Sequence, residues 1–281
     1  MSSVFDFDRP ADRYAVMGNP VAHSKSPQIH RLFAQQTRQA VEYTAIQVDL
    51  GGFPQAVGNF VAQQGKGLNV TVPFKGEAYK LADSLSEGAR VAAAVNTLII
   101  ENERIRGENT DATGLIRDIL HNHHGQIEHR DVLLLGAGGA ARAIVAGLLQ
   151  QHPRSLYIAN RSAEKAHHLA QLFPNPGAVP VNGGGFDQLK TKRFDWVINA
   201  TSSSLQEYDL QLPLDLLNPN AWCYDLMYGI KLNPFMLWAK NAGAERVLDG
   251  LGMLVEQAAE SFYLWRGVRP DTRPVLELLH A

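Results

Sequence analysis

The sequence contains a single cysteine, no long apolar run and little net charge, and each absence excludes a class of protein. Cys223 has no partner for an intramolecular disulfide, which favours a reducing compartment such as the cytoplasm. No apolar run approaches the ~20 residues of a membrane span, and residues 1–10 lack the apolar core of a signal peptide. A formal net charge of −2 provides no basic field for nucleic acid or an anionic membrane surface. We therefore expect a cytoplasmic protein, monomeric or homodimeric, whose partners are small molecules rather than nucleic acid or a membrane.

What the chain does contain is the composition of an ordinary globular protein. Of its 281 residues, 45% are hydrophobic and 19% are charged, so there is enough apolar surface to form a core. Single cores stop growing at roughly 250 to 300 residues, so a chain of this length favours two domains.

Strand and helix patterns alternate through the first part of the chain. Short apolar segments predict strands over residues 13–18, 41–48, 67–72 and 95–100. Apolar side chains at helical spacing predict helices over residues 27–39, 53–63 and 74–82. Such alternation is typical of an α/β fold with a largely parallel sheet.

A helix predicted over residues 110–121 separates this part from a second α/β series. The series has predicted strands at 132–135, 156–159, 196–199, 223–227 and 246–248, with helices such as 140–150 between them. A last helix, 251–265, is expected to pack back on the first domain. We therefore predict a first domain over residues 1–110, completed by residues 250–281, and a Rossmann-type, doubly wound domain over residues 111–249.

A glycine-rich turn follows the apolar strand that opens the second series. It reads Gly136-Ala137-Gly138-Gly139-Ala140-Ala141-Arg142 and begins a helix, which matches the G-x-G-x-x-G/A dinucleotide fingerprint. Gly136 permits the tight turn, Gly138 lets backbone N–H groups approach a pyrophosphate, and the helix N-terminus supplies partial positive charge. A glycine turn without a ligand is the alternative, but the flanking strand and helix favour nucleotide binding.

The tip of the next strand indicates which dinucleotide is bound. NAD enzymes place an acidic residue there, about 20 residues after the glycines, to bind the ribose 2′-hydroxyl. Here the tip reads Asn160-Arg161-Ser162, and Lys165 follows. The Arg161 guanidinium can bind a 2′-phosphate, with Ser162 and Lys165 as further donors. NADP(H) is therefore the predicted cofactor, the alternative being that Arg161 is a solvated loop residue.

Four further segments, residues 18–27, 69–75, 94–97 and 108–111, resemble the shikimate dehydrogenase family. With the glycine turn, the strand tip and segments near Asn199, Tyr224 and Asp249, the resemblance runs from about residue 14 to residue 267. It implies reversible, NADPH-dependent reduction of 3-dehydroshikimate to shikimate, a step of chorismate and aromatic amino-acid biosynthesis. The first domain would bind the substrate and the second NADP(H).

The resemblance also implies roles for individual residues. Lys75 and Asp111 correspond to the catalytic pair. The implied substrate residues, which offer hydroxyl and amide groups, are Ser24, Ser26, Asn69, Thr71, Asn96, Tyr228 and Gln257. The implied NADP(H) residues are Gly136, Ala137, Gly138, Gly139, Ala140, Asn160, Arg161, Ser162, Lys165, Thr201, Leu226 and Gly250, with Glu87 a weaker candidate.

The chemistry of these residue types agrees with such roles. Lys75 follows Pro73 and is predicted in the first turn of its helix, where the positive end of the helix dipole disfavours a cation. Asp111 would hold the ammonium group beside a substrate hydroxyl, with the ligand between the two domains. Taken singly, Ser26 and Asp111 are better explained as helix caps and Lys75 as a surface lysine. Taken together, hydroxyls, amides, a lysine and an aspartate suit a polyhydroxylated acid.

Histidines do not indicate a metal site. His121, His123 and His124 lie in a polar stretch without further ligands at metal-binding spacing, so a solvated helix end is the prediction. No metal is expected.

Two other functions share these motifs. An NAD-dependent quinate/shikimate dehydrogenase would favour an acidic residue in place of Arg161, and a non-catalytic NADP-responsive regulator would not need Lys75 and Asp111. The chain departs from the family pattern at Ser204, where glycine is common, and at Asn233, where threonine is common. Both departures are expected near the nicotinamide side of the cofactor site.

Overall fold

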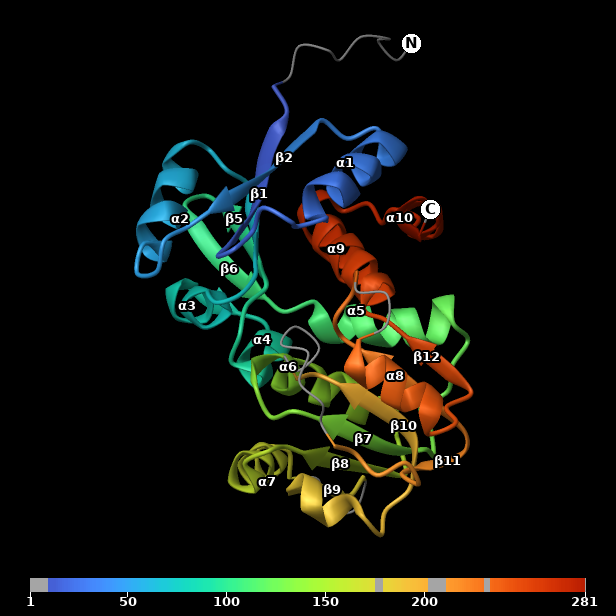
Figure 1. Cartoon of the computed structure of the whole chain (residues 1–281). Helices are drawn as coiled ribbons and strands as arrows, with labels where there is room; N and C mark the ends of the chain where they lie inside the picture. Colours follow the sequence, from blue (N-terminus) through green and yellow to red (C-terminus); the bar gives the residue numbers. More distant parts are fainter. Residues whose placement is uncertain (1–9, 175–178, 202–210, 230–232, 281) are drawn as a thin grey trace. The chain divides into compact units, whose positions relative to one another are not determined.

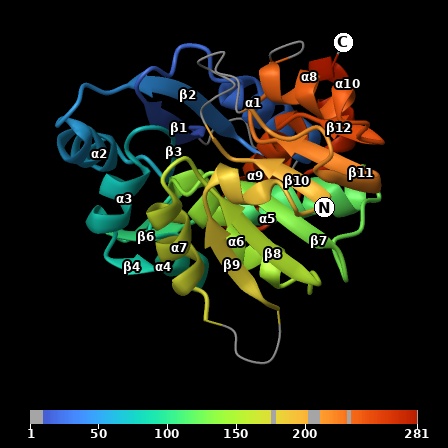
Figure 2. The ribbon, with the colours of Figure 1, turned by 60° about the horizontal axis from the view of Figure 1, so that its bottom comes forward.

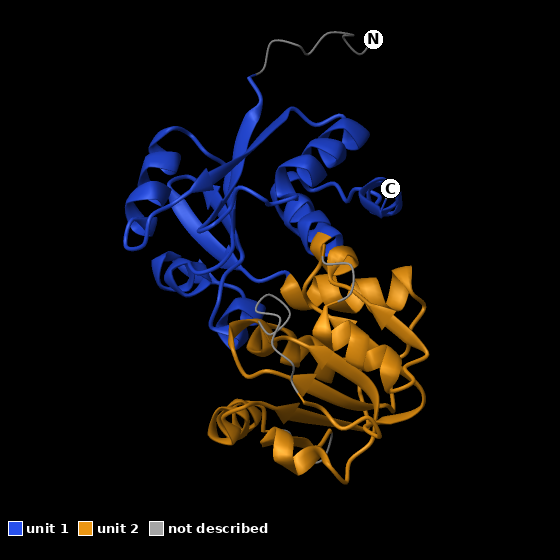
Figure 3. Cartoon of the chain, in the orientation of Figure 1, with its two compact units in different colours: residues 1–110, 255–281 blue, residues 111–254 orange. Residues whose placement is uncertain are grey.

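Two six-stranded sheets, each flanked by helices, organise the chain. The computed structural model describes residues 10–174, 179–201, 211–229 and 233–280. These residues fall into two units (Figure 3), one of residues 1–110 with 255–281 and the other of residues 111–254. The division lies within a helix, between Leu254 and Val255, whereas the sequence placed it before residue 250.

The sheet of the first unit has the order β2-β1-β3-β5-β6-β4; Figure 1 labels its strands β1, β2, β5 and β6. Its strands are β1 (Asp12–Gly18), β2 (Val41–Gln47), β3 (Gly67–Val70), β4 (Ser84–Leu85), β5 (Thr97–Glu101) and β6 (Arg104–Glu108). β1 pairs in parallel with β2 and β3, as the alternating pattern predicts. β5 pairs antiparallel with both β3 and β6.

The β5–β6 hairpin was not predicted from the sequence. Its two turn residues, Asn102 and Glu103, have φ values of 50° and 62°. Two consecutive left-handed residues form the turn that tight hairpins favour, and glycine at the second position is the usual sequence mark. Position 103 is a glutamate and not that glycine, so the sequence has no local signal that predicts the hairpin turn.

Helices of the first unit include the two that close the chain. They are α1 (Ser26–Thr37), α2 (Phe53–Ala62), α3 (Lys75–Leu81), α4 (Glu87–Ala92), most of α9 (Leu251–Arg266) and α10 (Arg273–His280). Phe53 of α2 stacks on Phe74, at 5.1 Å between ring centroids, inside a core that also holds Leu68 and Leu98. On α9, the indole of Trp265 donates to the carbonyl oxygen of Leu98 at 3.0 Å. Helix α9 therefore packs on the first sheet.

The sheet of the second unit is entirely parallel, with the order β12-β11-β10-β7-β8-β9 (Figure 2). Its strands are β7 (Asp131–Leu135), β8 (Ser155–Ala159), β9 (Val181–Gly184), β10 (Phe194–Asn199), β11 (Leu217–Asp225) and β12 (Arg246–Leu248). This is the doubly wound order of dinucleotide-binding domains, which confirms the predicted fold class. The strand order reverses between β7 and β10, so ligands are expected at the carboxyl ends of these strands.

The helices of the second unit are α5 (Asp111–Arg117), α6 (Gly139–Leu149), α7 (Ala163–Gln171) and α8 (Pro234–Asn241), with a 3₁₀ turn at Phe186–Leu189. The predicted helix over 110–121 is not α-helical throughout, because residues 118–122 form a π-helical turn. Asp118 in this turn is fully buried and accepts hydrogen bonds from the Tyr224 hydroxyl at 2.6 Å and the Asn122 amide at 2.8 Å. A Cβ atom added to Gly252, at the start of α9, would lie 1.9 Å from the Asp118 carboxylate. The π-helical turn, which is wider than an α-helical one, thus directs the buried Asp118 carboxylate toward the backbone of Gly252, where there is no side chain.

Within the described ranges, no helix has both the length and the apolar character required to cross a bilayer.

Close packing between β9 and α7 predicts unequal tolerance of alanine at two glycines. A Cβ atom on Gly183 would lie 2.3 Å from the carbonyl oxygen of Ala166, whereas one on Gly58 of α2 meets nothing within 4 Å. Gly183→Ala should therefore lower the free energy of unfolding by about 1 to 3 kcal/mol. Gly58→Ala, the matched control, should raise it by up to about 1 kcal/mol. Urea unfolding of both variants measures the difference, and equal stabilities would contradict this packing.

Candidate active site

The glycine turn lies at the carboxyl end of β7, where the strand order reverses. Gly136 has φ of 106°, and a Cβ atom there would lie 3.1 Å from the carbonyl oxygen of Ala200 and 3.2 Å from the Thr201 methyl group. Gly138 and Gly139 are exposed, and Cβ atoms added to them would meet nothing within 4 Å. Gly136 is thus required by the turn, while Gly138 and Gly139 leave the start of α6 open to a ligand. This opening suits a pyrophosphate.

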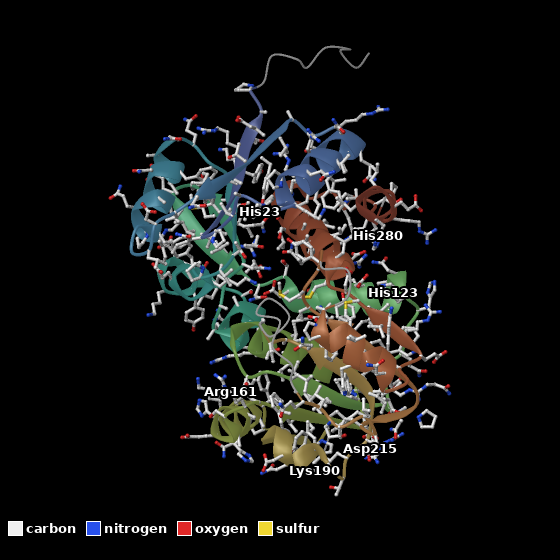
Figure 4. The ribbon with its side chains drawn as sticks, in the orientation of Figure 1. His23, His123, Arg161, Lys190, Asp215 and His280 are labelled. Atoms are coloured by element: carbon white, nitrogen blue, oxygen red, sulfur yellow. The ribbon has the colours of Figure 1, made fainter. Side chains whose placement is uncertain are left out.

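A cavity of about 360 Å³ adjoins this turn. Its lining comes from the glycine turn, α6 and the whole length of α7 with its two capping residues, and consists of Ala137, Arg142, Ser162, Glu164, Lys165, His168, Leu169 and Leu172. Exposed Arg161 directly precedes these α7 residues in the chain (Figure 4). The cations contributed by both helices suit a phosphate group. Arg142 and His168 were not predicted, although Arg142 follows the glycine fingerprint at once.

The remaining predicted cofactor residues of this unit follow β10, β11 and β12, the three strands on one side of β7 in the sheet. Thr201 comes after β10, Leu226 after β11 and Gly250 after β12, all at the edge that contains the glycine turn. The Thr201 hydroxyl donates to Oδ1 of Asn199 at 2.7 Å. A Cβ atom on Gly250 would lie 2.1 Å from the carbonyl oxygen of Leu226, so glycine allows these two segments to touch.

Asn233, one of the two departures from the family pattern, has a clear local function. Its side chain is buried, accepts from the backbone N–H of Met236 at 2.9 Å and so caps α8. Its amide donates to the fully buried Asp225 carboxylate at 2.8 Å, and the Asn199 amide reaches the same carboxylate at 3.2 Å. Asparagine is among the preferred N-cap residues, so Asn233 stabilises the start of α8. Ser204, the other departure, lies outside the described residues.

The first unit brings three of the predicted substrate residues into one buried polar network. Asn69 Nδ2 lies 3.2 Å from the Thr97 hydroxyl and 3.0 Å from the Ser261 hydroxyl. Asn96 Oδ1 accepts from the backbone N–H of Thr110 at 2.9 Å. The Asn96 amide nitrogen also donates to Gln257 Oε1 at 3.3 Å. Asn69, Asn96 and Gln257 therefore converge from β3, the start of β5 and α9.

Four members of this network were missed by sequence reasoning: Tyr43, Thr97, Thr110 and Ser261. Thr97 and Ser261 are 164 positions apart, yet their hydroxyl oxygens lie 2.8 Å from each other. Thr97, Thr110 and Ser261 are buried. Thr97 and Thr110 belong to the segments 94–97 and 108–111 that carry the family resemblance, but the sequence assigned neither of them a role in the site. No local pattern indicates such partners, because the network exists only once α9 packs on the sheet.

Ser24 and Ser26 lie where α1 begins. Ser24 Oγ accepts from the backbone N–H of Ser26 at 3.2 Å. The N-cap of α1 is Lys25, without a side-chain cap bond, so Ser26 is the first helical residue and does not cap the helix. The capping alternative considered for Ser26 is therefore wrong.

Thr71 and Lys75 flank the turn between β3 and α3. The Thr71 backbone N–H donates to the carbonyl oxygen of Met17 at 2.9 Å, which fixes this turn to β1. Lys75 is the first residue of α3 and so lies in the first turn of the helix, as predicted; its carbonyl oxygen accepts from the backbone N–H of Val95 at 3.0 Å. The backbone around Lys75 is thereby tied to the segment that leads into Asn96.

Asp111, Tyr228 and Glu87 are placed differently from the other candidates of their groups. Asp111 is the first residue of α5 and belongs to the second unit, but it follows Thr110 of the buried network directly. Tyr228 follows β11, also in the second unit, and burial raises the pKa of its hydroxyl. Glu87 is exposed at the start of α4 in the first unit, whereas all other predicted NADP(H) residues lie in the second.

Three family profiles match the chain. They are described as shikimate dehydrogenase substrate binding domain over residues 16–98, shikimate / quinate 5-dehydrogenase over residues 118–208, and shikimate 5'-dehydrogenase C-terminal domain over residues 250–280. A shikimate dehydrogenase (NADP(+)) of Nitrosococcus oceani is 52% identical over 269 residues, which cover 95% of each chain. The chain belongs to the shikimate dehydrogenase family.

Other members of the shikimate dehydrogenase family are similar to the chain over almost its whole length. A shikimate dehydrogenase (NADP(+)) of Methylobacillus flagellatus is 53% identical over 96% of this chain and 99% of its own. The crystal structure of shikimate 5-dehydrogenase from Thermus thermophilus in complex with NADP(H) and shikimate matches with a TM-score of 0.83 at 30% identity, covering 95% of this chain and 97% of that one. The family resemblance stated from the sequence motifs is thereby confirmed.

Among the residues that the structure describes, no group of three or more histidine, cysteine, aspartate or glutamate side chains could hold a metal ion.

A buried histidine lies beside the polar network of this shikimate dehydrogenase family member. His30 on α1 is fully buried and stacks on Tyr43, with ring centroids 4.2 Å apart and an interplanar angle of 6°. Neither ring nitrogen makes a hydrogen bond within the described part of the chain. Burial lowers the pKa of His30 to about 3, and the nearby Asn69 opposes this only in part. The imidazole is therefore neutral in the folded protein.

This histidine should make stability depend on pH. Because its pKa falls from 6.5 to about 3 on folding, the unfolded chain binds the extra proton, so stability is complete above pH 6.5 and declines as the pH falls towards 3. His30→Phe keeps a ring but cannot titrate. Between about pH 8 and about pH 5, its free energy of unfolding should fall by about 2 kcal/mol less than that of the wild type. Urea unfolding at both pH values tests this, with His129→Gln as control because the His129 side chain is 81% exposed. An unchanged pH dependence in His30→Phe would refute the prediction.

Proposed function

We propose that this chain is an NADP-dependent shikimate dehydrogenase, which reduces 3-dehydroshikimate reversibly to shikimate in chorismate and aromatic amino-acid biosynthesis. The main support is 52% identity over 95% of both chains to a relative named shikimate dehydrogenase (NADP(+)). Each unit has the chemistry that its part of this reaction needs. The second has an open glycine turn and a basic cavity, and the first has a buried network of hydroxyls and amides.

The cofactor site is proposed in the second unit. Backbone N–H groups of Gly136 to Ala140 would bind the pyrophosphate at the start of α6. Arg161, Ser162 and Lys165 would bind the 2′-phosphate, and Asn160 would shape that tip, since its amide donates to the Ser162 carbonyl oxygen at 3.0 Å. Thr201, Leu226 and Gly250, with Glu87 as a weaker candidate, would line the remainder. When bound, NADPH supplies the hydride.

Substrate recognition and proton transfer are proposed for the first unit together with Asp111 and Tyr228. Ser24 and Ser26 would bind the carboxylate, and Asn69, Thr71, Asn96, Tyr228 and Gln257 the hydroxyls. During reduction the Lys75 ammonium group would give its proton to the carbonyl oxygen at C3 of the substrate, and in the reverse direction Lys75 would take it back. Asp111 would hold the ammonium group in place.

The remaining proposals concern setting and partners. We propose a cytoplasmic enzyme, monomeric or homodimeric, whose partners are its substrate and cofactor. Burial raises the pKa of the single thiol, Cys223, which suits a cysteine without a redox function.

Removal of the proposed proton donor should reduce turnover strongly. Lys75→Ala should lower kcat for NADP⁺-dependent oxidation of shikimate by roughly 10² to 10⁴, with a much smaller change in KM. Lys80→Ala, in the last turn of the same helix, is the matched control and should retain activity. Absorbance of NADPH measures both. Wild-type turnover in Lys75→Ala would exclude this lysine from the chemistry. No activity in the wild-type protein would favour the alternative function, a non-catalytic NADP-responsive regulator.

Arg161 should determine the preference for NADP⁺ over NAD⁺. Arg161→Ala should lower kcat/KM for NADP⁺ by about 10- to 100-fold and leave the value for NAD⁺ almost unchanged, because only NADP⁺ has a 2′-phosphate. Arg193→Ala is the control, since Arg193 pairs with Asp215 on the surface. Assays with quinate and NAD⁺ test the alternative function. A wild type that prefers NAD⁺, or an equal loss for both cofactors in Arg161→Ala, would contradict this assignment.

A further inference from the structure

The Asn69 amide nitrogen makes its hydrogen bonds to groups within the protein. Asn69 Nδ2 lies within hydrogen-bond distance of three acceptors, the hydroxyls of Ser261 at 3.0 Å and Thr97 at 3.2 Å and the carbonyl oxygen of Asn96 at 3.3 Å. An amide nitrogen has only two hydrogens, so these three acceptors can use both. Any hydrogen bond from Asn69 to a ligand must therefore use Oδ1 as the acceptor.

Tyr43 approaches the other side of the same amide. Its hydroxyl donates to Asn69 Oδ1 at 2.7 Å. Burial raises the pKa of Tyr43 well above its usual value, which the nearby Ser26 hydroxyl opposes only in part, so the phenol stays protonated. Amide oxygens have two lone pairs, and Tyr43 uses one of them.

The reversed orientation of the Asn69 amide is disfavoured on both sides. It would place Oδ1 against the carbonyl oxygen of Asn96, which cannot donate, and would take the acceptor away from the Tyr43 hydroxyl. Stacking of Tyr43 on His30, at 4.2 Å and 6°, fixes the phenol ring. The amide is thus held in a single orientation.

From these contacts we propose that Tyr43 is a positioning residue, which holds the Asn69 amide so that Oδ1 can accept a hydrogen bond from a substrate hydroxyl. This inference rests on the proposed function, because it takes Asn69 as a substrate residue. It gives Asn69 a defined chemical requirement. The ligand group facing it must be a hydrogen-bond donor, which a hydroxyl of a polyhydroxylated acid satisfies and a keto or ether oxygen does not.

The experiment compares two tyrosines on neighbouring strands. Tyr43→Phe removes only the hydroxyl and should raise KM for shikimate about tenfold, while kcat and KM for NADP⁺ stay within about twofold. Tyr14 pairs with Tyr43 in the sheet register, is buried, and accepts a hydrogen bond from Arg266 at 3.3 Å instead. Tyr14→Phe is therefore the control and should keep the KM for shikimate. Equal increases in KM for shikimate and NADP⁺ in Tyr43→Phe, together with a lower Tm, would reduce Tyr43 to a structural residue and overturn the proposal.

A double-mutant cycle separates this inference from the proposed function. If Tyr43 acts through Asn69, the double variant Tyr43→Phe/Asn69→Ala should have the KM for shikimate of Asn69→Ala alone. Additive increases would overturn the positioning role. A raised KM in Asn69→Ala with a normal KM in Tyr43→Phe would also overturn it, while leaving Asn69 in the substrate site. An unchanged KM in Asn69→Ala would instead remove Asn69 from that site.

Discussion

One buried hydroxyl, that of Ser261, joins the parts of the first unit for which we propose substrate recognition. It lies 3.0 Å from the Asn69 amide, 2.8 Å from the Thr97 hydroxyl and 3.4 Å from the Thr110 hydroxyl, and it donates to the carbonyl oxygen of Gln257 at 3.0 Å. Buried polar groups must find partners within the protein, and a fully satisfied network allows few arrangements. The last long helix therefore orients amides that lie more than 150 positions earlier in the chain.

In the second unit, backbone geometry and one buried side-chain cluster together shape the edge of the sheet where the cofactor site is proposed. Its glycines act in opposite ways: Gly136 and Gly250 allow backbone segments to touch, whereas Gly138 and Gly139 keep a surface bare. The Asp225 carboxylate, between the amides of Asn199 and Asn233, connects the end of β10 to the start of α8. Contacts within the protein thus hold the segments at this edge of the sheet together.

Much of the fold could be predicted because its signals are local. The apolar strand at residues 131–135, the glycine turn after it and the helix that follows are contiguous, so their periodicity and composition were sufficient. The β5–β6 hairpin and the π-helical turn at Asp118 depend on an unusual turn residue and on tertiary contacts with Tyr224. The same distinction holds in the candidate site. Motif residues such as Asn69 and Asn96 could be identified from the sequence, but Tyr43 and Ser261 could not, because only folding makes them neighbours.

The contact between Asp118 and Gly252 constrains how sequences of this fold can diverge. The carboxylate occupies the space that any side chain at position 252 would need, and it is held there by Tyr224 and Asn122. Neither position can change freely while the other keeps its residue. Among relatives, we expect a larger residue at 252 to occur only with a shorter one at 118, so that two positions 134 apart in the chain evolve as a pair.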